Sequence, residues 1–121
     1  MEDAIRYFLT VHNEIKLLHW TTSSYATHKA LDDLHEGLGP LIDQFIECYM
    51  GHNNIHHHKP FKVKLDLNAD ASPTKVHKFL TTQRNNLTSM VETYKDAPGF
   101  ENILAEMVAI FDNTLYLTNL K

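Results

Sequence analysis

Cysteine, glycine and proline are scarce in this sequence. The 121 residues include one cysteine, Cys48, four glycines and four prolines. A single cysteine cannot form an internal disulfide, and a low-complexity chain would contain far more glycine and proline. These shortages exclude a disulfide-stabilised scaffold and a disordered tail protein.

Long hydrophobic runs and an excess of positive charge are also missing. No apolar run approaches the ~20 residues that span a bilayer, and the acidic start Met1-Glu2-Asp3 does not resemble a signal peptide. The formal net charge of -4 argues against binding of nucleic acid through a general basic surface. We therefore expect a cytoplasmic protein with no membrane association and little affinity for DNA, whose basic residues cluster locally between Lys59 and Arg84.

Hydrophobic residues make up 43% of the chain and recur at helical spacing in four stretches. We predict helices from Asp3 to Trp20, from the capping residues Thr21–Ser24 to Gly51, from Ser72-Pro73 to Tyr94, and from Phe100 to the last residue. The inner stripe of the first helix is expected to contain Ile5, Phe8, Leu9, His12, Ile15, Leu18 and His19.

Two segments depart from this regular pattern. Gly39-Pro40 lies inside the second helix, and because proline removes a backbone donor and clashes with the preceding turn, we expect a kink there. After His52 the helical period is lost, and Phe61, Val63, Leu65 and Leu67 alternate with charged residues. This two-residue period predicts an extended segment with the four apolar side chains facing inward, along the bundle or paired with another subunit.

Two helical hairpins joined by one long connection make an all-α four-helix bundle with a crossover, in a single domain over residues 1–121. The crossover is long enough for the second and third helices to run parallel. Folds of this kind support many functions, so the function has to be argued from individual side chains.

Histidine and acidic side chains form a stripe on the second helix. His28, Asp32, Asp43 and Glu47 follow one another at steps of four, eleven and four residues, which keeps them on one side of an α-helix at ~100° per residue. His19, near the end of the first helix, can add one more nitrogen. Imidazole and carboxylate ligands without a thiolate suit Fe(II), Mn(II) or Zn(II).

The same stripe is also typical of the solvated face of an amphipathic helix. The two interpretations differ in burial, since carboxylates packed together inside a protein cost several kcal/mol unless a cation neutralises them.

The order Leu18-His19-Trp20, then His28-x3-Asp32, then Asp43-x3-Glu47 resembles the ferroxidase motif of the miniferritins, the Dps family (DNA-binding proteins from starved cells). The resemblance covers the first two helices well, and the ending Asn113–Leu117 more loosely. It implies a ferritin-like bundle that forms at least a homodimer, and it leaves open whether further subunits close a cage-like homo-oligomer.

The resemblance also implies an iron site shared across a two-fold axis. One subunit would supply His19, His28 and Asp32, and its partner would supply Asp43 and Glu47. The protein would bind Fe(II) and oxidise it with peroxide or O2, for iron sequestration or protection against oxidative stress. Zn and Mn are alternative metals for the same site, and Trp20 would lie beside the metal.

The alternative function is that of a helical structural or interaction oligomer with a vestigial or purely structural metal site. Several departures from the family pattern bear on this choice. The interval from His19 to His28 is shorter than usual, the extended segment replaces the short helix of the family's crossover, and no Lys-rich extension precedes the first helix. The chain looks most like the short miniferritin-like proteins of some phages and large viruses, which would place it in a host cytoplasm.

Other histidine, cysteine and methionine residues receive simpler interpretations. We expect His56-His57-His58 to form a surface loop, because consecutive residues of an extended chain point to opposite sides and do not easily meet one ion. His12 is interpreted as a core histidine with satisfied hydrogen bonds, Cys48 as a small buried apolar residue, and Met90 and Met107 as core residues.

Overall fold

The computed structural model describes residues 2–65 and 71–120. It contains four α-helices: α1 (Glu2–Thr21), α2 (Tyr25–His52), α3 (Pro73–Thr93) and α4 (Pro98–Thr118). No strand occurs in those two ranges, so the prediction of an all-α protein with four helices is confirmed. None of the helices in this described part combines the length and the hydropathy needed to cross a bilayer.

Serine side chains start two of the helices, as their positions in the sequence predict. The Ser24 hydroxyl accepts a hydrogen bond from the Thr27 amide at 3.2 Å at the start of α2. The Ser72 hydroxyl accepts one from the Lys75 amide at 3.4 Å at the start of α3. These bonds satisfy amides of the first turn, which have no partner within the helix. The fourth helix begins slightly earlier than predicted, at Pro98, because proline fits the first helical position.

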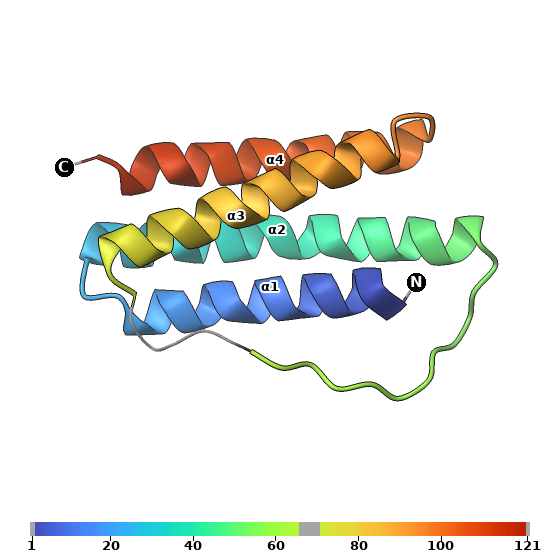
Figure 1. The fold of residues 1–121 in the computed structure, drawn as a ribbon, viewed down its shortest axis with the longest axis horizontal. Helices are drawn as coiled ribbons and strands as arrows, with labels where there is room; N and C mark the ends of the chain where they lie inside the picture. The colour runs from blue at the N-terminus through green and yellow to red at the C-terminus, as the bar shows by residue number, and fades with distance from the viewer. Residues whose placement is uncertain (1, 66–70, 121) are drawn as a thin grey trace.

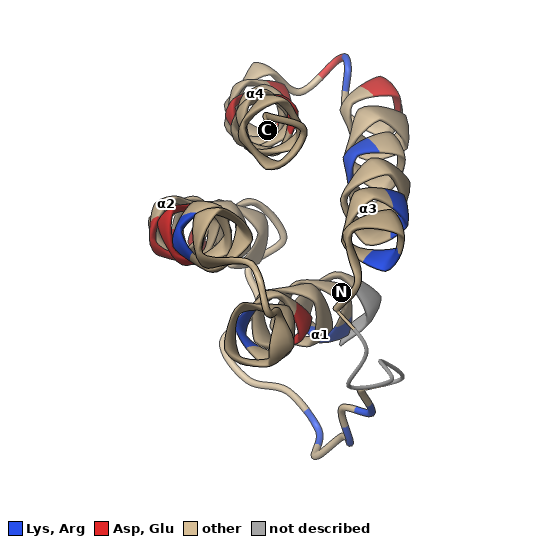
Figure 2. Ribbon diagram, turned by 90° about the vertical axis from the view of Figure 1, so that its left-hand side faces the viewer, with Lys and Arg blue, Asp and Glu red and all other residues tan. Residues whose placement is uncertain are grey.

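The four helices lie side by side around one core (Figures 1 and 2). Helix α2 packs against α1 and α4, and α4 packs against α3. The Tyr7 hydroxyl donates to Gln83 Oε1 at 2.8 Å and so links α1 to α3. In Figure 1, α2 and α3 both start at the left end of the bundle and run to the right, so the two helices run in the same direction.

Large apolar side chains from all four helices fill the centre of the bundle. The most deeply buried are Phe8, Ile15, Leu18, Leu31, Leu34, Leu38, Phe45, Leu80, Leu87, Leu104, Met107 and Phe111. Burial of each contributes about 1.5–3 kcal/mol. Leu9 is an exception to the predicted inner stripe and is 42% exposed, because it is turned ~100° away from its buried neighbour Phe8.

Helix α2 continues through Gly39-Pro40 without interruption. Figure 1 shows it crossing the bundle as one rod, and Leu38 and Leu41 are buried on either side of the proline. The proline therefore does not end the helix, and the size of any bend there stays a prediction.

The connection after α2 has no regular secondary structure in its described part. Phe61 and Val63 are half-buried, and the Arg6 guanidinium lies 5.4 Å from the centre of the Phe61 ring. Leu65 is 37% exposed, so the prediction of an inward side chain is wrong there, while Leu67 lies outside the described residues. Because the segment pairs with no strand in the described chain, nothing holds its side chains in strict alternation.

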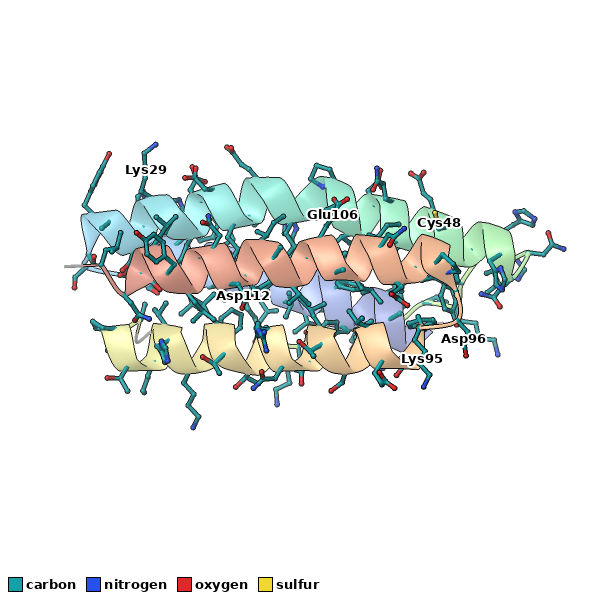
Figure 3. The ribbon with its side chains drawn as sticks, turned by 90° about the horizontal axis from the view of Figure 1, so that it is seen from above. Lys29, Cys48, Lys95, Asp96, Glu106 and Asp112 are labelled. Carbon is teal, nitrogen blue, oxygen red and sulfur yellow. The ribbon has the colours of Figure 1, made fainter. Side chains whose placement is uncertain are left out.

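Cys48 is exposed, and the prediction that it is buried is wrong. The core-facing positions of this part of α2 are Leu41 and Phe45, with Tyr49 half-buried. Cys48 falls beside that stripe, next to the exposed Glu47, and lies on the outer side of α2 in Figure 3.

Candidate metal centre

His19 and His28 form a reciprocal pair at the turn between α1 and α2. His19 lies in the last turn of α1, and His28 lies at the start of α2. The Nδ1 atom of each ring lies 2.7 Å from the backbone carbonyl oxygen of the other residue. The two rings stack, with centroids 3.8 Å apart and planes at 19°. The short turn therefore brings two of the five predicted ligands together.

These hydrogen bonds fix the hydrogen positions on both rings. A carbonyl oxygen can only accept, so the Nδ1 atom of each ring carries the hydrogen. In a neutral imidazole the Nε2 atom then keeps a lone pair, which is the form that binds metal. The His19 ring is also held by burial, with 7% of the residue exposed. Both histidines are thus prepared as ligands through Nε2.

Asp32 lies one helical turn after His28, and its side chain lies near His19. Its Oδ1 atom is 3.9 Å from Nε2 of His19, which is too far for a hydrogen bond. The same oxygen is 3.7 Å from Nζ of Lys16 on α1. An imidazole nitrogen and a carboxylate oxygen at this separation can both reach one small cation, since metal–ligand bonds to N and O are about 2.0–2.2 Å.

Asp43 and Glu47 lie elsewhere on the same helix. Both side chains are exposed, and the rise of ~1.5 Å per residue puts Asp43 about 16 Å along the axis from Asp32. One chain therefore does not bring these two acids to the half containing Asp32. In residues 2–65 and 71–120, no three His, Cys, Asp or Glu side chains are grouped closely enough to hold a metal ion.

A second histidine pair lies further along the seam between α1 and α2. The rings of His12 and His35 stack, with centroids 3.7 Å apart and planes at 5°. The Nε2 atom of His12 donates to the His35 carbonyl oxygen at 3.0 Å, so the predicted hydrogen bonding of His12 is confirmed, although the residue is half-buried rather than part of the core. In this pair, in contrast to His19 and His28, the hydrogen bond uses the Nε2 atom of His12, so that atom cannot also bind a metal.

His35 is a residue that the sequence reasoning missed. The signal was present: His12 and His19 are seven residues apart on α1, and His28 and His35 are seven apart on α2, so two pairs can stack two turns apart. The pKa of His35 is lowered, first by burial and then by the charges of His12 and Lys16, while Asp32 opposes the shift. The contact between α1 and α2 therefore contains a row of polar side chains, in which Lys16 and Asp32 lie between the two stacked histidine pairs.

Two exposed aromatic residues flank the His19–His28 pair. Trp20 is 65% exposed and Tyr25 is 75% exposed, and the Tyr25 ring centroid lies 6.4 Å from that of His28. Trp20 follows the predicted ligand His19 directly, but within one chain its side chain faces solvent. Apart from its position directly after the helix cap, nothing in the sequence indicated that Tyr25 would lie near His28.

The His56-His57-His58 segment is exposed, as predicted. His56 bonds through Nε2 to Asn54 Oδ1 at 3.0 Å, whereas His58 bonds through Nδ1 to the Lys59 carbonyl oxygen at 3.0 Å. Neighbouring rings thus bond to different partners, which favours the interpretation as a surface loop.

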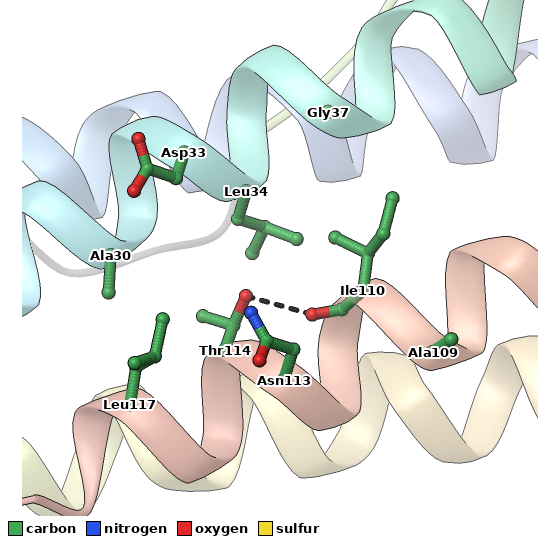
Figure 4. A pocket seen from close by; sticks show the side chains of 9 residues that line it. All are labelled: Ala30, Asp33, Leu34, Gly37, Ala109, Ile110, Asn113, Thr114 and Leu117. Atoms are coloured by element: carbon green, nitrogen blue, oxygen red, sulfur yellow. Dashed lines mark hydrogen bonds between the residues drawn. The ribbon is translucent and has the colours of Figure 1, made fainter.

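Two hollows lie away from the histidine pair. One, of about 340 Å³, runs between α2 and α4 (Figure 4) and is lined by Ala30, Asp33, Leu34, Gly37, Ala109, Ile110, Asn113, Thr114 and Leu117. The Thr114 hydroxyl there donates to the Ile110 carbonyl oxygen at 2.9 Å. The other, of about 380 Å³, includes Cys48, His52 and the turn before α4. Neither is lined by any of the five predicted ligands.

A protein-family model described as "Family of unknown function (DUF5856)" matches residues 19–118. The match begins at His19 and spans all five predicted ligands. Searches of curated proteins and of solved structures gave no match.

Proposed function

The chain belongs to DUF5856, a family of unknown function, and we propose that it is a ferritin-like, iron-binding protein of the miniferritin type that oxidises Fe(II) at a site shared by two subunits. The observation that carries the proposal is the reciprocal His19–His28 pair, in which both Nδ1–H groups donate to backbone carbonyls at 2.7 Å. That arrangement leaves the Nε2 lone pair of each neutral ring available for a ligand, and Nε2 of His19 lies 3.9 Å from Oδ1 of Asp32.

The donor set fits Fe(II). Two imidazole nitrogens and one carboxylate form a half-site that leaves coordination positions for further ligands and for the oxidant. The carboxylates favour the more highly charged Fe(III), and the fixed imidazoles set the ligand geometry. Fe(II) is the substrate, and two Fe(II) ions supply the two electrons that reduce one peroxide, with two protons, to two water molecules. The same donors also accept Zn or Mn.

A two-fold arrangement of two chains would reunite the halves of the motif. The pair His28 and Glu47 and the pair Asp32 and Asp43 have a common midpoint on α2, between residues 37 and 38. If two α2 helices cross antiparallel at that point, His28 of each chain lies opposite Glu47 of the partner subunit, and Asp32 lies opposite Asp43 of the partner subunit.

Charge favours a bound cation between the two halves of such an antiparallel pair. Asp32 lies in the first half of α2, Asp43 and Glu47 lie in the second, and Lys29 is the only Lys or Arg of this helix. Carboxylates of the two chains would therefore face one another, which costs free energy unless a cation neutralises them. Figure 2 shows acidic residues on the outer side of α2.

The main competing function is a structural oligomer without turnover. The exposed aromatic residues Trp20, Tyr25 and Tyr116 favour association with other subunits whether or not iron is oxidised. The two functions differ in whether the protein oxidises Fe(II) through its carboxylates, so an oxidation assay with substitutions of single acids separates them.

The test is Fe(II) oxidation by protein purified without added iron, with metal content determined first. After anaerobic Fe(II) loading, peroxide or O2 is added and the absorbance of Fe(III) is followed. We expect Asp32→Asn and Glu47→Gln each to abolish the fast phase, while the control Asp33→Asn, at a neighbouring exposed acid, keeps it. Fast oxidation that survives both substitutions, or a wild type that binds no metal, would refute the ferroxidase proposal.

A further inference from the structure

Lys16 occupies the position of a counter-ion in the half-site. It lies on α1 between His12 and His19, and its Nζ atom is 3.7 Å from Oδ1 of Asp32. That oxygen is also the one that lies 3.9 Å from Nε2 of His19. Oδ1 of Asp32 therefore lies near both the ammonium group of Lys16 and the His19 nitrogen that would bind the metal.

The ammonium and a divalent cation compete for the same carboxylate. A metal ion bonded to Nε2 of His19 and Oδ1 of Asp32 would lie within a few ångströms of a positive charge that points at the same oxygen. Like charges at such a distance repel strongly where water is partly excluded, and the two side chains of the ion pair are only 32% and 36% exposed. The charge of Lys16 also acts along the seam, since it contributes to the lowered pKa of His35.

The Lys16 side chain can move away from Asp32. Its side chain is flexible and partly exposed, and a lysine ammonium holds one carboxylate as a point charge without the two-pronged geometry of arginine. Displacement needs only rotation of the side chain toward solvent, whereas His19 and His28 are fixed by hydrogen bonds.

We propose that Lys16 is the resident counter-cation of the half-site and sets its metal affinity: the ammonium neutralises Asp32 in the metal-free protein, and a divalent metal ion binds by displacing it. This inference rests on the proposed function, because it assumes that His19, His28 and Asp32 bind a metal. It adds a residue that sets metal affinity without being a ligand.

The test is calorimetric titration with Co(II), which has the same charge as Fe(II) and is not oxidised by air under these conditions. Lys16→Met removes the charge and keeps most of the apolar stem, and we expect it to bind Co(II) about tenfold more tightly than the wild type. Lys16→Arg keeps the charge and should bind no more tightly than the wild type. Lys29→Met, at an exposed lysine on the outer side of α2 (Figure 3), is the matched control and should change the affinity less than twofold.

A second readout follows the lysine itself. Amine labelling with peptide mass spectrometry should show that Lys16 becomes more reactive when Co(II) is added, while the reactivity of Lys29 stays constant. A purely structural lysine would show no such change.

The outcomes separate this inference from the proposed function. If the wild type and Asp32→Asn bind Co(II) equally weakly, the proposed function fails. If Asp32→Asn abolishes binding but Lys16→Met binds as the wild type or more weakly, the metal site stands and the role of Lys16 is refuted. An equal gain in affinity for Lys16→Met and Lys29→Met would show that only net charge matters, which also refutes it.

Discussion

His19 and His28 each bond through the ring Nδ1 to the backbone carbonyl oxygen of the other, at 2.7 Å in both directions. His28 thereby satisfies a carbonyl in the last turn of α1, a group with no partner within its own helix. The pair joins the end of one helix to the start of the next and leaves the Nε2 atom of each neutral ring with a lone pair, as the proposed metal site requires. The same contacts therefore cap the helix and set the hydrogen positions on both rings.

The His12–His35 stack predicts a pH-dependent stability. The folded protein lowers the pKa of His35, chiefly by burial and with help from His12 and Lys16. The contribution of neutral His35 is present above its unfolded pKa of ~6.5 and is lost as the pH falls through the lower folded value. Between about pH 7.5 and 5, we expect the urea midpoint of the wild type to fall more than that of His35→Gln.

The matched control for this measurement is His57→Gln, at an exposed histidine of the connection. Its urea midpoint should follow the wild type across the same pH range. Parallel profiles for the wild type and His35→Gln would show that ionisation of His35 is not coupled to folding.

The hydrogen bond from Tyr7 to Gln83 predicts a measurable loss of stability on its removal. Burial raises the pKa of Tyr7 to about 12, so the hydroxyl stays protonated and donates to Gln83 Oε1 at neutral pH. We expect Tyr7→Phe to lower the free energy of unfolding by about 0.5–1.5 kcal/mol, measured by urea denaturation. Tyr116→Phe, at a tyrosine that is 63% exposed, should have no measurable effect, and equal losses for the two variants would contradict the assignment.

The elements of this fold were predictable because their signals are local. Ser24 and Ser72 precede apolar residues at helical spacing, and a capping side chain needs only the next three residues of its own helix. The burial of individual positions was less predictable. Leu9 and Cys48 lie at the edge of an apolar stripe. A rotation of the helix about its axis by less than the angle between successive residues decides whether such a side chain faces the core or the solvent. That rotation depends on how the neighbouring helix packs.

The candidate site was predictable as a set of ligand types but not as a set of contacts. His19, His28 and Asp32 were identified from their spacing. The structure stacks His19 on His28 and places Asp32 Oδ1 3.9 Å from His19 Nε2, but within the described residues it does not group the three closely enough to hold a metal ion. Lys16 and His35 were missed because their roles depend on which residues of α1 lie opposite which residues of α2. This alignment of α1 with α2 is set by the packing between the two helices, and the periodicity of either helix alone does not predict it.

Charge predicts weak binding to DNA. The net charge is -4, and the local cluster of basic residues between Lys59 and Arg84 holds only six Lys and Arg residues. Few phosphates can then be neutralised at once, and affinity falls steeply with salt. In gel-shift experiments with duplex DNA, we expect no retention at physiological salt. Retention that persists at moderate salt would contradict this prediction and assign a function to the basic residues between Lys59 and Arg84.

The location of the complete metal site gives the sharpest prediction. If each site takes His28 from one subunit and Glu47 from the other, His28→Ala and Glu47→Ala should each abolish fast Fe(II) oxidation. In a mixed dimer, one site receives both damaged halves. The other site receives the intact histidine half from the Glu47→Ala chain and the intact acidic half from the His28→Ala chain.

Random reassociation of equal amounts makes about half of the dimers mixed, each with one intact site of two, so about a quarter of wild-type activity should return under two-fold symmetry. A site built within one subunit would regain nothing, because every chain carries one of the two defects. The measurement is the initial rate of Fe(II) oxidation after denaturation and refolding of the mixture, with each variant refolded alone as the control. Subunit exchange is verified by mass spectrometry, and exchange without recovery of activity would rule out the shared site.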